Sequence, residues 1–189
     1  EELIRLKDIA LRHDLFLISD EVYRDFIYSD NKTYTSIYSF PDLAQHAILI
    51  DSISKRFSAC GARIGMVATK NKQVLETVLK FAQQRLSPPT VEQLGMLGLL
   101  EVEEEYFHKV NIEYRKRRDT LVEGLNKIEG VKCPTPGGAF YCIVQLPVED
   151  TDDFCRWMLS DFNYEGETVM MAPASGFYAT EGKGKNEVR

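Results

Sequence analysis

The stretch that decides the fold is SISKRFSACGARIG, residues 52–65. It follows a short apolar run at 47–50 and precedes another at 64–68. A polar, glycine-containing segment between two such runs indicates a loop that joins two buried strands. Lys55 lies on this loop. A lysine in a loop is usually a solvated surface residue, so the residues around it have to decide whether it has a function.

The neighbours of Lys55 suit a bound anion. Two hydroxyls, Ser52 and Ser54, come just before it, and Arg63 follows eight residues later. Hydroxyls and a guanidinium are good phosphate ligands, and arginine grips phosphate through two parallel hydrogen bonds. A lysine amine can form a Schiff base with an aldehyde. A phosphorylated aldehyde held by a lysine points to pyridoxal phosphate (PLP) as the cofactor.

A second motif lies upstream, where the apolar run 15–19 ends at Asp20-Glu21-Val22-Tyr23. The run predicts a buried parallel strand that neighbours the strand before Lys55. Polar residues at the carboxyl ends of such strands are where α/β proteins place their sites. Asp20 would keep the pyridine nitrogen protonated, and Tyr23 would bind the ring's 3-oxygen. Taken singly, Asp20 also fits a loop start, Tyr23 a core residue and Arg63 a surface ion pair.

Composition limits the classes of protein to consider. The 189 residues are 44% hydrophobic with a net charge of −6, so nucleic acid and anionic membranes are not the expected partners. No apolar run approaches the length of a membrane span. The four cysteines (Cys60, Cys133, Cys142 and Cys155) form no CxxC pair. They predict free thiols in a reducing compartment, the cytoplasm, and no metal site.

Hydrophobic periodicity predicts an α/β chain in two parts. We expect residues 1–103 to belong to a large domain with a mostly parallel sheet and flanking helices, and 104–189 to form a smaller α+β domain. The expected helices cover 1–13, 71–85 with Asn71 as N-cap, 90–102, 103–128, and 151–162 with Thr151 as N-cap. The expected strands cover 15–19, 47–51, 64–69, 139–146 and 168–172, with another beginning at 187.

The two motifs together resemble a known family. The pattern Ser-x-Ser-Lys-x-Phe-Ser-x-x-Gly-x-Arg-x-Gly at 52–65 resembles the cofactor-lysine signature of the class I/II, fold-type I PLP-dependent aminotransferases. Asp20-x-x-Tyr23 resembles that family's Asp-x-x-Tyr at the usual distance upstream. The resemblance implies the fold-type I architecture, PLP as cofactor, and an aldimine with Lys55.

The resemblance extends along the chain. Residues 1–19 are similar to the segment after the family's Asn-Pro-x-x-Pro-Thr-Gly motif, so we expect a longer protein cut at both ends. The segment 137–140 resembles a small-domain strand, which implies that Phe140 borders the substrate. Residues 172–177 resemble the family's Pro-Gly-Ser-x-Phe loop, with Ala174 in place of glycine, so the backbone there is expected to differ. Asn186-Glu187-Val188-Arg189 resembles Asn-x-Val-Arg, which implies that Arg189 binds the substrate α-carboxylate.

The family implies a reaction. An amino acid, aspartate or a similar one, would pass its amino group to a 2-oxo acid, with Lys55 moving the α-proton and a homodimer as the working form. Two alternatives stay open. One is a β-lyase or decarboxylase of the same fold, and the other is an aminotransferase-like sensing domain of a transcription regulator.

Overall fold

The computed structural model describes residues 1–29 and 33–189. The chain divides into two compact units, Glu1–Asn111 and Ile112–Arg189. The long helix α5 (Glu104–Leu125) contributes residues to both. The domain boundary predicted near residue 104 stays a prediction.

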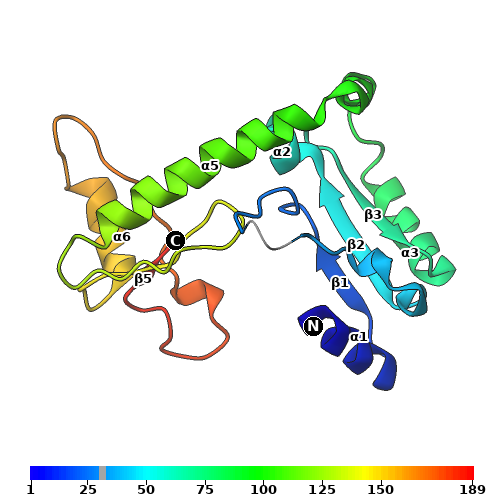
Figure 1. The fold of residues 1–189 in the computed structure, drawn as a ribbon, viewed down its shortest axis with the longest axis horizontal. Helices are drawn as coiled ribbons and strands as arrows, with labels where there is room; N and C mark the ends of the chain where they lie inside the picture. The colour runs from blue at the N-terminus through cyan, green and yellow to red at the C-terminus, as the bar shows by residue number, and fades with distance from the viewer. Residues whose placement is uncertain (30–32) are drawn as a thin grey trace. The chain divides into compact units, whose positions relative to one another are not determined.

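The first unit is built on a three-stranded sheet in the order β1-β2-β3, drawn in blue to green in Figure 1. Its strands are β1 (Leu17–Asp20), β2 (Ala47–Ser52) and β3 (Gly65–Thr69). β1 pairs with β2 in parallel, as predicted, whereas β3 runs antiparallel to β2. The parallel pairing places the carboxyl ends of β1 and β2 at the same edge of the sheet.

The helices of the first unit follow much of the predicted pattern. The single helix expected at 90–102 is wrong in its second half, because the segment is α-helical only to Gly95 and continues as a 3₁₀ helix. Gly95 and Gly98 lower the α-helix propensity there. The helices of this unit are α1 (Glu2–Arg12), η1 (Ile37–Ser39), η2 (Pro41–Leu43), α2 (Ile53–Arg56), η3 (Cys60–Ala62), α3 (Lys72–Gln84), α4 (Thr90–Gly95) and η4 (Met96–Glu101).

Helix α3 begins where the sequence predicts. The Asn71 side chain accepts a hydrogen bond from the Val74 N–H at 3.1 Å. This bond satisfies one of the backbone donors that the first turn of a helix leaves without an intrahelical partner. The predicted Asn71 cap is therefore confirmed.

One face of the sheet is packed and the other is open. Ala10 of α1, Ile37, Leu43 and Ala47 form a buried cluster that Leu17 of β1 joins. Ile18 points to the opposite face and is 62% exposed. The prediction that the 15–19 strand is buried is therefore wrong for this face, because α1, η1 and η2 cover only one side.

The second unit packs around a core of Val122, Cys133, Val144, Cys155 and Val188. Its regular pairing is short: β4 (Val144–Gln145) runs antiparallel to β5 (Glu187–Val188). The expected strand 139–146 is thus mostly wrong, because Ala139 turns the chain with φ 56° and β5 pairs with only the last part. The start of a strand at 187 is confirmed.

The expected strand 168–172 does not form a regular strand. Ala172 instead exchanges two backbone hydrogen bonds with Arg189, of 3.1 and 2.8 Å, and Pro173 forms an isolated bridge with Val188. The pairing extends to Ala174, whose N–H donates to the Glu187 carbonyl oxygen at 2.8 Å, and the chain then forms the 3₁₀ turn η5 (Ser175–Phe177).

Helix α6 (Thr151–Ser160) is capped by Asp150, not by Thr151 as predicted. The Asp150 carboxylate accepts from the N–H groups of Asp152 and Asp153. The Thr151 side chain is fully buried, and its hydroxyl lies 3.0 and 2.8 Å from the carbonyl oxygens of Lys185 and Glu187. Thr151 therefore fastens α6 to the segment that leads into β5.

The four cysteines are free thiols with different surroundings: Cys60 is exposed, whereas Cys133 and Cys155 are buried. Burial, together with the neighbouring Cys142, raises the pKa of Cys133 to about 11.

Among the described residues, no helix combines the length and apolar character needed to cross a membrane.

Because the thiolate is the reactive form, iodoacetamide at pH 8 is expected to modify Cys60 at least ~10-fold faster than Cys133 in the folded protein. Peptide mass spectrometry after timed quenching measures both rates. In urea, where burial is lost, the two rates should converge. Equal rates in the folded protein would contradict the buried environment of Cys133.

Candidate active site

Lys55 lies on a short helix rather than on the loop that the sequence predicted. β2 ends at Ser52, whose side chain accepts from the Ser54 N–H at 3.1 Å and so starts α2. Lys55 is the third residue of α2, and its side chain is half-buried. The N-cap serine therefore decides where the strand stops and on which turn the lysine lies.

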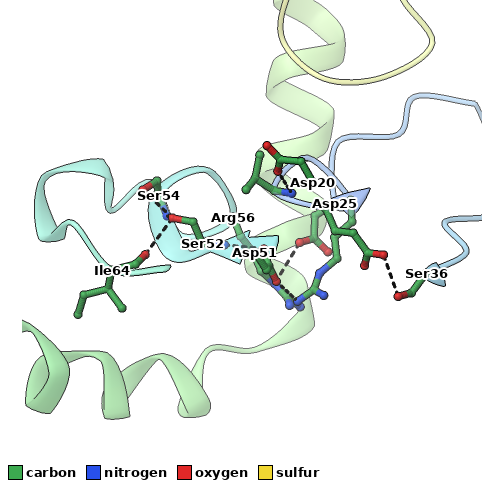
Figure 2. Close-up of polar contacts among 11 residues, drawn as sticks. Asp20, Asp25, Ser36, Asp51, Ser52, Ser54, Arg56 and Ile64 are labelled. Atoms are coloured by element: carbon green, nitrogen blue, oxygen red, sulfur yellow. Dashed lines mark hydrogen bonds and ion pairs between the residues drawn. The ribbon is translucent and has the colours of Figure 1, made fainter. Parts of the chain in front are cut away.

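The two predicted phosphate ligands beside Lys55 are in contact with each other (Figure 2). The Ser52 hydroxyl donates to the Ile64 carbonyl oxygen at 2.9 Å, and the two Oγ atoms of Ser52 and Ser54 lie 2.8 Å apart. A hydroxyl has one proton, so Ser52 accepts the proton of Ser54. Ser54 is free to turn that proton to a phosphate, while Ser52 keeps its bond to Ile64.

Arg63 follows η3 and precedes β3. It adopts the left-handed conformation, φ 56° and ψ 40°, and its Nη1 donates to the Cys60 carbonyl oxygen at 2.8 Å. Left-handed backbone is uncommon for residues other than glycine and often occurs at functional sites. Two residues later, a Cβ on Gly65 would lie 3.0 Å from the Asp51 carbonyl oxygen, so the close pairing of β2 and β3 favours glycine there.

Asp20 ends β1 at the same sheet edge. It lies opposite Ile50 in the parallel register, two residues before Ser52. Its side chain is exposed, and Oδ1 accepts from the Val22 N–H at 3.2 Å. Tyr23 is half-buried with its ring edge-on to Phe26. The structure thus brings Asp20, Tyr23, Ser52, Ser54, Lys55 and Arg63 to one end of one sheet.

Glu21 is a residue of this site that sequence reasoning missed. It is 1% exposed, and its Oε1 accepts from the Ser36 hydroxyl at 2.9 Å and the Ile37 N–H at 3.1 Å. Burial and a hydrogen bond to Glu21 also raise the pKa of Tyr34. Glu21 therefore anchors the segment 34–37 beside Asp20. A carboxylate directly after a strand-end aspartate was the only sequence signal for it.

The second unit holds the predicted substrate residues. Arg189 follows β5, and its guanidinium lies between the rings of Tyr141 and Phe177, 4.7 and 4.6 Å from their centroids. These contacts are within cation–π distance. Phe140 stacks on Tyr114 of α5 at 5.1 Å. Tyr141 was not singled out from the sequence, although it directly follows the predicted Phe140.

Ala174 replaces the family's glycine in the loop at 172–177, where a different backbone conformation was expected. It has φ −90° and ψ −8°, an ordinary right-handed conformation, and is fully buried. Its N–H donates to the Glu187 carbonyl oxygen at 2.8 Å. Alanine is therefore accommodated in this loop without backbone strain.

Known aminotransferases resemble this chain in sequence. The family model for aminotransferase class I and II matches residues 1–184. The aspartate aminotransferase of Bacillus subtilis (strain 168) is 30% identical over 190 residues, covering 96% of this chain and 47% of that protein. B. subtilis also has a putative aminotransferase, YugH, that is 31% identical over 94% of this chain and 44% of its own length. The chain thus spans about half the length of the curated relatives it matches.

A solved structure agrees with these relatives. The aromatic aminotransferase of Pyrococcus horikoshii OT3 superposes with a TM-score of 0.82 at 30% identity, covering 99% of this chain and 48% of that one. The predicted fold-type I α/β architecture is confirmed by this likeness. Because the family model matches nearly the whole chain, these residues belong to the class I and II aminotransferases.

Proposed function

We propose that the protein carrying this chain is a PLP-dependent aminotransferase that moves an amino group from an amino acid, aspartate or a similar one, to a 2-oxo acid. The observation that carries the proposal is the parallel register of β1 and β2. It sets Asp20 and the helix of Lys55 at one sheet edge. Membership of the aminotransferase family supports the same reaction.

The donor set fits PLP. Lys55 would hold the aldehyde carbon through its amine, and Ser54 and Arg63 would donate to the phosphate, with Ser52 holding Ser54 in place by accepting from the Ser54 N–H. Asp20 would face the pyridine nitrogen, and Tyr23 would donate to the 3-oxygen. When bound, PLP supplies an electron sink for the negative charge left at the substrate α-carbon.

Each side chain then has a defined task. Arg189 would bind the substrate α-carboxylate with its fork of N–H donors, and Phe140 would border the substrate. The Lys55 amine would be released when the substrate amine takes its place on the cofactor. It would then take the α-proton from the substrate and return it to the cofactor carbon. The backbone of Lys55 is fixed in the one-turn helix α2. Its long, half-buried side chain can still move to carry the proton.

The assignment of Lys55 has a direct test. After incubation of the complete protein with PLP and borohydride reduction, peptide mass spectrometry is expected to find a phosphopyridoxyl group on Lys55. A modification on another lysine, or none, would contradict the site. With a panel of amino donors, release of ammonia or pyruvate in place of amino transfer would contradict the reaction.

We also propose a homodimer in the cytoplasm as the working form. Free thiols support a reducing compartment. Exposed leucines on α3 and α4, among them Leu79 and Leu94, offer apolar surface for a second subunit. A monomeric mass of the complete protein in light scattering would contradict the dimer.

A further inference from the structure

A nearly buried ion pair joins the turn after β1 to the end of β2. Arg24 Nη2 lies 2.8 Å from Asp51 Oδ2, and the two side chains are 26% and 9% exposed. The other carboxylate oxygen of Asp51 accepts from the Ser52 N–H at 2.8 Å. A carboxylate this deeply buried requires a partner charge. Asp51 therefore links Arg24, the residue after Tyr23, to the N-cap of the lysine helix.

A second ion pair lies on the other side of the lysine. Arg56 Nε lies 3.0 Å from Asp25 Oδ2, without the alignment of a hydrogen bond, so the contact is Coulombic. The Arg56 guanidinium also lies 4.9 Å from the ring centroid of Phe107. Asn111 donates to the carbonyl oxygens of Asp25 and Ile27 at 3.1 and 3.0 Å. Two residues of α5 thus contact the two partners of this pair: Phe107 contacts Arg56, and Asn111 bonds the backbone of Asp25.

The two pairs connect the same two segments at two points (Figure 2). We call residues 20–25 the acidic turn and residues 51–56 the lysine turn. One pair joins the acidic turn to the residue before Ser52, and the other joins it to the residue after Lys55. The backbone pairing of the two segments ends where the Glu21 N–H donates to the Ile50 carbonyl oxygen at 2.8 Å. Beyond that point the two ion pairs, at separate positions, set both the distance and the rotation of one segment against the other.

We propose that the Arg24–Asp51 and Asp25–Arg56 ion pairs are a positioning device that holds the acidic turn in one orientation against the lysine turn. The proposal rests on the proposed function, because the acidic turn carries Asp20 and Tyr23 and the lysine turn carries Lys55. Each of the four charged residues is paired with another of the four, and they would act by setting where the cofactor-binding side chains stand.

The test uses the complete protein loaded with PLP and breaks the buried pair by two near-isosteric changes. Asp51→Asn keeps an acceptor for the Ser52 N–H and removes the charge, and Arg24→Gln removes the opposite charge. The double variant leaves two neutral amides that can bond each other. The readout is the pH midpoint of the bound cofactor's absorbance titration, with PLP affinity measured in parallel.

Each single variant is expected to raise the pH midpoint by about half a unit or more, because Tyr23 would no longer favour the anionic 3-oxygen by its hydrogen bond. Affinity for PLP should fall roughly 10-fold. The double variant should recover at least half of the midpoint shift. Arg156→Gln, which breaks an exposed pair with Asp153 where the arginine is 71% exposed, is the matched control and should leave the midpoint unchanged.

Two outcomes overturn the proposal, and they are distinguishable. If the wild type binds PLP and the single variants lose thermal stability with an unchanged midpoint, the pairs are only structural and the proposal fails alone. If the wild type retains no cofactor absorbance after free PLP is removed, the proposed function fails and the proposal fails with it.

Discussion

Lys55→Ala in the complete protein is expected to lower the rate of amino transfer at least ~10⁴-fold, because one side chain performs two tasks. It would hold the cofactor covalently, and it would move the α-proton, a step for which a positioned base contributes roughly 10²–10⁴-fold. The measurement is steady-state transamination of an amino acid with a 2-oxo acid, with PLP in excess.

The matched control is Lys72→Ala, because Lys72 is also a lysine near a helix start but is 89% exposed. It should keep the wild-type rate. Circular dichroism of the Lys55→Ala protein should match the wild type, since Ser52, and not Lys55, caps α2. Turnover within ten-fold of wild type by the Lys55→Ala variant would refute the catalytic assignment.

Arg189→Ala is expected to reduce kcat/KM for amino acid substrates roughly 10²–10³-fold, mainly by raising KM. Losing one partner of a hydrogen-bonded charge pair costs about 2–5 kcal/mol in binding. The guanidinium is held between two aromatic rings, so it is pre-oriented for its ligand. Initial rates over a range of substrate concentrations separate KM from kcat.

Arg189→Lys is the informative companion. Lysine keeps the charge but lacks the planar fork and stacks less well on aromatic rings, so it should recover only a small part of the lost kcat/KM. Arg156→Ala, at an exposed position of α6, controls for removal of an arginine. If Arg189→Ala leaves KM unchanged, the substrate carboxylate is bound elsewhere.

The motif of the lysine turn could be recognised from sequence, although the sequence predicted a loop where the structure has the helix α2. Ser52 caps a helix two residues away, and Ser54 and Lys55 follow within the same turn. The Asn71 cap of α3 was predictable because it is a contact between near neighbours in the chain. The predicted pairing of the β1 and β2 strands was also confirmed, since buried strands in α/β chains commonly run side by side.

Thr151 and the strand expected at 139–146 show what local patterns cannot decide. Thr151 has the residue type of an N-cap, but the segment at 185–187 draws its hydroxyl away. The apolar run at 139–146 has strand character, but a strand needs a partner, and β5 pairs with only two of its residues. Local propensity gave way to contacts with distant segments in both cases.

The sequence by itself determined the motif at 52–65 and its family, because the order of serine, lysine, arginine and glycine can be read there without any distant contact. Only the tertiary structure decided how the acidic turn is held against it. The Arg24–Asp51 pair, the Asp25–Arg56 pair and the aromatic rings around Arg189 join segments far apart in the chain. Charges and rings of these types occur throughout the sequence, and folding alone selects which of them meet.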